Sequence, residues 1–213
     1  MVAIDDSRSM AENRCGVMAL EALTLITRAL SRLEVGDLGV VAFGAQGAVR
    51  ELLPLGAPFS DAAGPGLVGA FTFAAENTVA DAPAVELLDA LDASLEAARE
   101  RHRGGGAQLQ QLVLVLADGH FHEKSTLRLR LRRLAERRGL LVAFIALDNP
   151  GASLLDMQSV SFASGKPVFS KYMDSFPFPY YALVQNIGSL PSMLADLLRQ
   201  WFEVTANGQL EGQ

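Results

Sequence analysis

Apolar residues follow two patterns along the chain, and together these predict alternating strands and helices. Apolar runs of strand length occur at 2–4, 38–43, 112–117 and 140–147. Residues 181–187 are expected to form the last strand, and 49–53 a shorter edge strand. Apolar residues at three- and four-residue spacing predict helices over about 15–33, after Asn77-Thr78, over about 124–138 and after Pro191. This alternation predicts an α/β fold with a doubly wound, mostly parallel sheet flanked by helices.

Two segments interrupt the alternation. Residues 54–69 hold three prolines and four glycines, which predicts a loop with at most a short helix, and 66–73 is ambiguous. Residues 148–180 have no helical period, and we expect an irregular insertion there that contains a short hairpin including 168–172. The domain is expected to span 1–204, and the polar residues 205–213 to form a flexible tail.

Composition narrows the class of protein. The 213 residues are half apolar and one-fifth charged, as in a folded globular domain. The formal net charge of −6 argues against a general binder of nucleic acid or anionic membranes. A single cysteine, Cys15, excludes an internal disulfide and is expected to be buried. Because the chain starts almost inside its first predicted strand, we expect a piece of a longer protein or a truncated gene product.

Oxygen-bearing side chains gather just after the predicted strands. Asp5, Ser7 and Ser9 follow the first strand, Thr78 precedes a helix, and Asp118 follows the strand at 112–117. Ligands of open α/β sheets bind at the carboxyl ends of the strands, so these groups can converge there. An all-oxygen set favours Mg²⁺, with Mn²⁺ or Ca²⁺ as alternatives, over zinc. Each motif alone also suits a helix cap or a turn, and only their combination favours a metal.

This combination resembles the metal-ion-dependent adhesion site (MIDAS) of von Willebrand A domains. Asp5, Ser7 and Ser9 match the family's Asp-x-Ser-x-Ser, Thr78 its second-loop threonine, and Asp118 its Asp-Gly loop. The resemblance implies that the hydroxyls bind the cation directly, that the aspartates often act through water, and that an acidic side chain of a partner completes the shell. Thr78 follows Glu76-Asn77 instead of a glycine-rich lead-in, so Thr72 is kept as an alternative ligand.

Longer segments of the second half resemble the midasin family of dynein-related AAA+ ATPases, which act in assembly of the large ribosomal subunit. These segments are 118–124, 155–162, 172–181 and 190–202. The resemblance implies a nuclear protein-binding domain without catalysis of its own. Its expected partners are the ubiquitin-like domains of two pre-60S assembly factors, the pre-60S particle and the AAA+ ring of the parent chain. No phosphate-binding loop is present, because Ser164-Gly-Lys-Pro167 lacks the required spacing.

The remaining charged and aromatic segments each have a structural and a functional interpretation. Arg8, His120 and His122 are candidates for contact with the partner, whereas a zinc site at the two histidines lacks a third ligand. The arginines of 128–138 predict a solvated helix face or an electrostatic contact with rRNA, the pre-ribosome or the parent ring, and 176–181 is either core or partner contact. The alternative functions are a von Willebrand A module of another complex and a magnesium-dependent phosphohydrolase with Asp5 or Asp6 as nucleophile. Ser7 stands where such phosphatases have a second aspartate.

Overall fold

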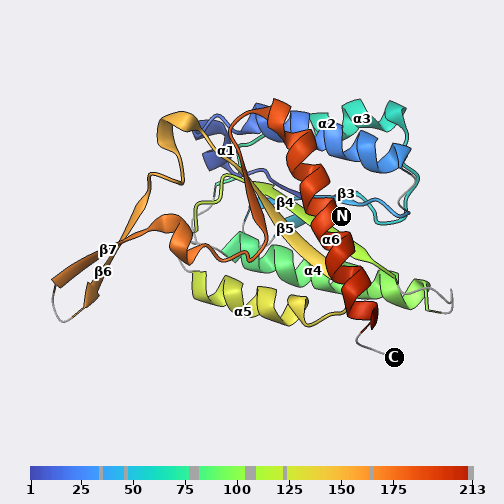
Figure 1. Cartoon of the computed structure of the whole chain (residues 1–213). Coiled ribbons are helices and arrows are strands. Elements are labelled where there is room, and N and C mark those ends of the chain that lie inside the picture. The colour runs from blue at the N-terminus through green and yellow to red at the C-terminus, as the bar shows by residue number, and fades with distance from the viewer. Residues whose placement is uncertain are drawn as a thin grey trace.

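The computed structural model describes residues 1–33, 36–45, 48–76, 82–103, 109–121, 124–163 and 166–210. Six strands form one sheet in the order β3-β2-β1-β4-β5-β8 (Figure 1). Their bounds are β1 Val2–Asp5, β2 Val40–Ala45, β3 Ala48–Leu53, β4 Gln111–Ala117, β5 Leu140–Leu147 and β8 Tyr181–Val184. Every neighbouring pair is parallel except β2 and β3, where the edge strand β3 runs antiparallel. The predicted doubly wound sheet is confirmed.

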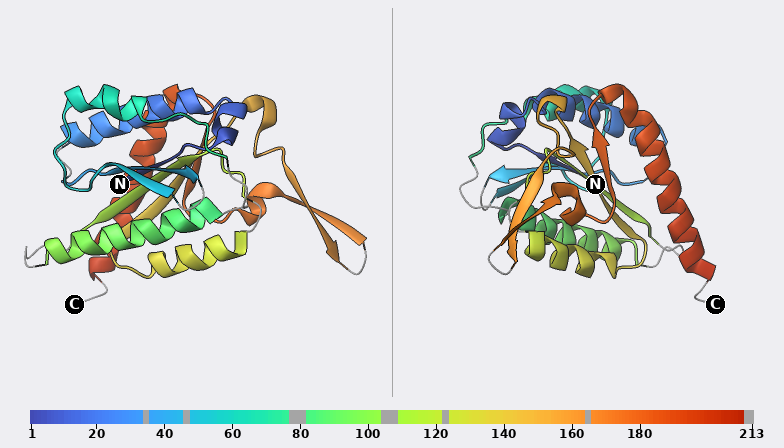
Figure 2. Two further views of the ribbon diagram at one scale, coloured as in Figure 1. Left: turned by 180° about the vertical axis from the view of Figure 1, so that it is seen from behind. Right: turned by 60° about the vertical axis from the view of Figure 1, so that its left-hand side comes forward.

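Helices cover both faces of this sheet (Figures 1 and 2). One face carries α1 Arg8–Glu12, α2 Gly16–Arg32, α3 Gly64–Gly69 and α6 Leu190–Leu210, and the other carries α4 Ala82–Arg101 and α5 Lys124–Ala135. Successive strand residues point to opposite faces, so Val2 and Ile4 of β1 pack in the core beneath α2 while Ala3 packs beneath α4. Within the described ranges, no helix is both long and apolar enough to cross a membrane.

Element boundaries differ from the sequence prediction at three places. Helix α5 ends at Ala135, and Gly139 then takes φ +74° close to the Leu109 carbonyl, which suits glycine and leads the chain into β5. Strand β8 ends at Val184, because Asn186 accepts a hydrogen bond from the Gly188 amide and starts a 3₁₀ turn over Ile187–Ser189. Helix α6 continues to Leu210, so helical backbone covers most of the segment expected to be a flexible tail.

The two irregular segments are largely as predicted. Between β3 and α4 lie a 3₁₀ turn at Asp61–Ala63 and the short α3. In the insertion, the 3₁₀ turn Pro150–Ala152 leads to an antiparallel hairpin of β6 Gln158–Ala163 and β7 Lys166–Lys171, followed by the 3₁₀ turn Tyr172–Ser175. The hairpin projects from the body of the molecule (Figures 1 and 2).

Beneath the insertion, an aromatic cluster joins it to the core. The ring of Phe144 on β5 lies 5.3 Å from that of Phe176 and 4.6 Å from that of Phe178, centroid to centroid. Both phenylalanines of the insertion are buried, whereas Tyr180 and Tyr181 are exposed. The core interpretation of this aromatic segment is therefore correct for its two buried phenylalanines.

The arginines of α5 and of the segment after it, which holds Arg137 and Arg138, divide into two groups. Arg130 pairs with Asp89 of α4 at 3.2 Å, Arg137 pairs with Asp92 and Glu96 of the same helix, and Arg128 donates to the Ser175 carbonyl at 2.6 Å. These three tie α5 to α4 and to the insertion. The remaining three are exposed, as expected for a solvated face: Arg132, Arg133 and Arg138.

Candidate metal centre

The candidate site lies where the chain direction reverses across the sheet. Strands β1 and β4 are parallel neighbours, and the chain leaves β1 toward α1 and α2 on one face but leaves β4 toward α5 on the other. This divergence opens a crevice at the carboxyl ends of the two strands, the usual ligand position in such sheets. Asp5 is the last residue of β1, and Asp118 directly follows β4. The fold thus brings together two carboxylates that are far apart in sequence.

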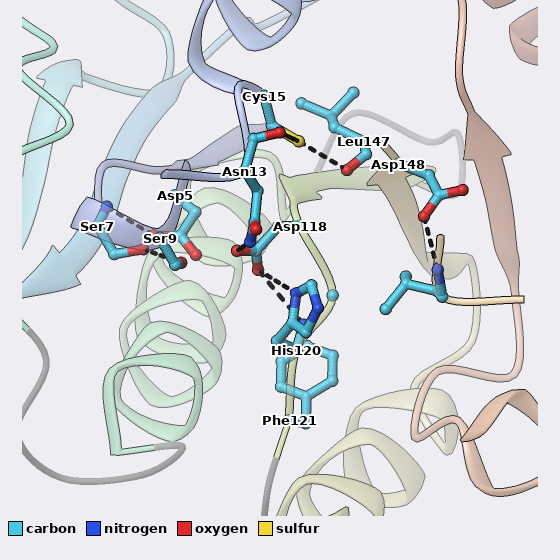
Figure 3. A network of polar contacts seen from close by, with 12 residues as sticks. Asp5, Ser7, Ser9, Asn13, Cys15, Asp118, His120, Phe121, Leu147 and Asp148 are labelled. Carbon is cyan, nitrogen blue, oxygen red and sulfur yellow. Dashed lines mark hydrogen bonds and ion pairs between the residues drawn. The ribbon is translucent and has the colours of Figure 1, made fainter. Parts of the chain in front are cut away.

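Two hydroxyls face the carboxylates from the start of α1. The Oγ atoms of Ser7 and Ser9 lie 3.0 Å apart, and the Ser7 amide donates to Asp5 Oδ1 at 2.8 Å (Figure 3). Ser7 occupies the N-cap position, yet its side chain makes no capping hydrogen bond. The capping interpretation of the Asp-x-Ser-x-Ser motif is therefore wrong for Ser7, and its hydroxyl is directed to the site.

A glycine of β2 makes this close packing feasible. Gly44 has φ +126°, and a Cβ atom there would lie 2.7 Å from both Asp5 Oδ1 and the Ser7 amide nitrogen. Any side chain at this position would displace the first turn of the site. No motif in the sequence marks Gly44, because its role depends on the pairing of β1 with β2.

Asp118 is held by hydrogen bonds from several directions. The Asn13 amide donates to Oδ2 at 2.9 Å, and the backbone amide of His120 approaches Oδ1 at 3.3 Å (Figure 3). Burial opposes ionisation of this carboxyl, but the hydrogen bonds of His120, Ser9 and Asn13 outweigh it and lower its pKa. Asp118 is thereby kept as a carboxylate. Asn13, at the C-cap of α1, was not among the predicted site residues.

The pKa of Asp5 is shifted in the opposite direction from that of Asp118. Burial, chiefly, and then the neighbouring negative charge of Asp118 raise its pKa to about 7, although the hydrogen bonds of Ser7 act against this. A carboxylate in such surroundings lacks a positive partner. A divalent cation between Asp5 and Asp118 would supply that charge, so the residues present fit the implied metal.

The donor set suits a hard cation. Adjacent oxygens around octahedral Mg²⁺, with bonds of about 2.0–2.1 Å, are separated by about 2.9 Å, and the Ser7 and Ser9 hydroxyl oxygens lie 3.0 Å apart, which is also a hydrogen-bond distance. Over the described part of the chain, no group of three or more His, Cys, Asp and Glu side chains is arranged to hold a metal ion. A cation here would depend on hydroxyls and water as well as carboxylates.

Asp6 has a structural role instead of a chemical one. It is buried, its Oδ2 pairs with Arg50 at 2.5 Å, and its Oδ1 accepts from the backbone amides of Thr72 and Phe73 at 2.8 and 2.5 Å. Both oxygens are therefore engaged, which disfavours the alternative in which Asp6 acts as a nucleophile. Thr72 is fixed through its backbone, and its exposed side chain does not line the pocket.

A pocket of about 420 Å³ opens above these groups. Its lining includes the four candidate ligands Asp5, Ser7, Ser9 and Asp118 and, at the rim, Arg8, Glu76 and His120. Arg8 pairs with Glu76 at 2.6 Å. His120 Nδ1 lies 3.5 Å from Asp118 Oδ1, and this contact is the main cause of its raised pKa.

Two predicted site residues, Thr78 and His122, lie outside the described residues. The assignment of Thr78 as the fifth ligand therefore stays a prediction.

The sheet order and the crevice between β1 and β4 define a von Willebrand A fold. Among solved structures, proximal thread matrix protein 1 from the mussel byssus, described with a zinc-occupied MIDAS motif, superposes with a TM-score of 0.55. The two share 14% sequence identity, and the match covers 91% of this chain and 45% of that one. A second crystal form of that protein gives a TM-score of 0.51.

The sequence itself is similar to midasin. It is 37% identical to midasin of Dictyostelium discoideum over 213 residues and 38% identical to midasin of Giardia intestinalis over 209. These matches cover 98% and 95% of this chain but only 3% and 4% of the two relatives. No family model matches the chain. The resemblance to a von Willebrand A segment of midasin that the sequence predicts is thus confirmed.

Proposed function

We propose that this chain is the metal-dependent protein-binding domain of a midasin-like ribosome-assembly ATPase. In this proposal it binds the ubiquitin-like domains of pre-60S assembly factors in the nucleus, so that the motor of the longer protein can remove them from the particle. The observation that carries the proposal is the meeting of Asp5, Ser7, Ser9 and Asp118 in one open pocket at the carboxyl edge of the sheet. The similarity to midasin along nearly the whole chain supports the choice of partner.

In the proposed site, Ser7, Ser9 and Thr78 would hold Mg²⁺ directly, with Mn²⁺ or Ca²⁺ as alternatives, and Asp5 and Asp118 would act directly or through water. The hydroxyls are neutral, so they bind the ion without cancelling its charge. When bound, the cation supplies an electrophilic position that accepts a carboxylate from the partner. Asn13 holds Asp118 in place through its 2.9 Å hydrogen bond.

The rim would contact the partner around this central carboxylate. Arg8 and His120 both line the pocket, and the side chain of Arg8 is more than half exposed. A partner that brings an acidic residue to the metal would also meet the Arg8 guanidinium, and this charge favours an acidic over a basic surface around that residue. The engagement of both oxygens of Asp6 argues against the alternative of a phosphohydrolase that uses this residue.

The test is a calorimetric titration of the domain with a recombinant ubiquitin-like domain of a pre-60S assembly factor, in Mg²⁺ and in EDTA. We expect Asp118→Ala and chelation each to weaken binding by about a hundredfold or more, because the central contact of the interface is lost. Asp196→Ala is the matched control, since this aspartate lies exposed on α6 and pairs only with Arg199 among the described residues. Tight binding that persists in EDTA would reject the proposal.

A further inference from the structure

The hairpin of β6 and β7 has one face that is apolar near its centre. In its antiparallel register, Val160 lies directly opposite Phe169, and Gln158 lies opposite Lys171. Because side chains two positions apart share a face of a strand, these four residues lie on the same side, together with Pro167. We call this set, Gln158, Val160, Pro167, Phe169 and Lys171, the Val160–Phe169 face. The other side carries Ser159, Val168 and Ser170.

This face is not covered by the rest of the described chain. Phe169 is 64% exposed and Val160 is 53% exposed, and every residue of β7 is exposed. The hairpin extends away from the helices and the main sheet (Figures 1 and 2). Large apolar side chains that project into solvent on a two-stranded ribbon are a typical signature of an interaction surface.

The hairpin is attached directly to the loop that carries Asp118. Tyr172, at the end of β7, is buried, and its hydroxyl donates to the Gly119 carbonyl at 2.9 Å and accepts from the Phe121 amide at 2.6 Å. Lys124 Nζ lies 3.3 Å from the centre of the Tyr172 ring and donates to the Tyr172 carbonyl at 3.1 Å. The base of the hairpin and the metal-site loop therefore form one hydrogen-bonded unit.

Topology puts the hairpin on the same side of the molecule as the site. It is inserted after the carboxyl end of β5, which runs parallel to β4, so it leaves the sheet from the edge that carries Asp5 and Asp118. The two strands of about six residues can extend about 20 Å outward. A protein seated on the pocket can therefore reach the hairpin without contacting the opposite edge of the sheet.

We propose that the Val160–Phe169 face is a second contact surface for the same protein that places its carboxylate at the metal site. The occupant is a folded protein whose apolar patch, bordered by acidic residues, lies beside its metal-binding carboxylate. Charge supports this choice: the hairpin strands carry Lys166 and Lys171 and no acidic residue, and Lys171 forms no ion pair with the described residues. This inference rests on the proposed function and adds the hydrophobic part of the interface.

The size of protein interfaces gives an independent reason for a second surface. A stable interface buries about 800 Å² on each partner, and its affinity comes mainly from a few large apolar or aromatic side chains at its centre. The pocket lining combines charged groups such as Arg8 and Glu76 with apolar ones that are small or partly buried, such as Ala75 and Phe121. Val160 and Phe169 would add two large apolar side chains that are more than half exposed.

The experiment is the calorimetric titration described above, with the ubiquitin-like domain as the probe and Mg²⁺ present throughout. The double variant V160S/F169S should lose about tenfold or more in affinity, as expected for removing two apolar anchors. Val168→Ser is the matched control, because Val168 is 45% exposed and lies on the other face of the same hairpin. It should keep its affinity within about twofold. Circular dichroism and thermal unfolding check that both variants fold like the wild type.

The outcomes separate this inference from the proposed function. If Asp118→Ala abolishes binding while V160S/F169S binds like the wild type, the hairpin inference is wrong and the metal-dependent function stands. An equal loss of affinity in Val168→Ser would also overturn the hairpin inference, since the effect would then not be specific to the Val160–Phe169 face. Sedimentation decides the remaining case: if the double variant only breaks a dimer of the wild type, the face serves a second copy of the chain and the inference fails.

Discussion

Replacing Asp5 by asparagine should make the metal-free domain more stable and at the same time remove its response to metal. Asp5 is buried beside Asp118, and its carboxylate has no positive partner among the described residues. Asparagine has the same shape, and its Oδ1 can still accept the hydrogen bond from the Ser7 amide. The substitution therefore removes the charge with little change in packing.

The size of the effect follows from the pKa of Asp5. Burial and Asp118 raise this pKa from 3.8 to about 7 in the metal-free fold. One pH unit corresponds to about 1.36 kcal/mol, so ionised Asp5 costs the folded state about 4 kcal/mol above pH 7, as an order of magnitude. Because the folded state holds this proton more tightly than the unfolded state, wild-type stability falls as the pH rises from about 4 to about 7.

Urea unfolding in EDTA at about pH 4.5, 6 and 8 tests this prediction. The free energy of unfolding of Asp5→Asn should exceed that of the wild type by about 1 kcal/mol at the lowest pH, where Asp5 of the unfolded chain is already largely ionised, and by about 4 kcal/mol at the highest. Added Mg²⁺ should then stabilise the wild type and leave the variant unchanged. A variant that is less stable than the wild type in EDTA at the highest pH would refute the reasoning, because Asp5 would then be a satisfied carboxylate.

Four further substitutions test the surroundings of the site. Asp6→Ala should lower the free energy of unfolding by about 2 kcal/mol, since it removes a buried carboxyl that accepts hydrogen bonds from Arg50 and from the backbone amides of Thr72 and Phe73; a negligible loss in urea denaturation would contradict this. Thr78→Ala should weaken Mg²⁺ binding at least about tenfold, and Thr72→Ala should leave it unchanged. If calorimetry shows a loss of Mg²⁺ affinity in Thr72→Ala but not in Thr78→Ala, Thr72 is the ligand. Tyr172→Phe should weaken Mg²⁺ binding with the fold retained, because the loop that carries Asp118 loses the hydrogen bonds of the Tyr172 hydroxyl to Gly119 and Phe121. Unchanged Mg²⁺ affinity would show that these hydrogen bonds are not needed to hold the loop.

The parts of the site that could be predicted from sequence are those fixed by local pattern. Asp5, Ser7 and Ser9 follow an apolar strand at alternate positions, and Asp118 follows another, so parallel pairing alone brings them to one edge. The alternation of strands and helices predicts the doubly wound sheet in the same way, whereas the position of each strand within it comes from the structure.

Other parts depend on contacts that no local pattern encodes. Asn13 reaches Asp118 across 105 positions, and Gly44 matters only because β2 lies against the first turn of the site. The carboxyl of Asp6 is engaged by Arg50 and by the backbone amides of Thr72 and Phe73, which lie far from it in sequence. These roles arise from tertiary packing, which single-sequence periodicity does not describe.

The length of α6 illustrates a different limit. Its polar sequence beyond Val204 suggested a frayed tail, yet the helix continues to Leu210. Residues such as Ala206, Gln209 and Leu210 have adequate helix propensity, so the absence of an apolar stripe does not end the helix.

The most direct test of the central claim is a structure of this domain bound to a ubiquitin-like domain in the presence of Mg²⁺. We expect a cation held by Ser7 and Ser9, with a carboxylate oxygen of the partner about 2.1 Å from it. A complex in which the partner binds elsewhere, or in which water alone completes the shell of the cation, would contradict it.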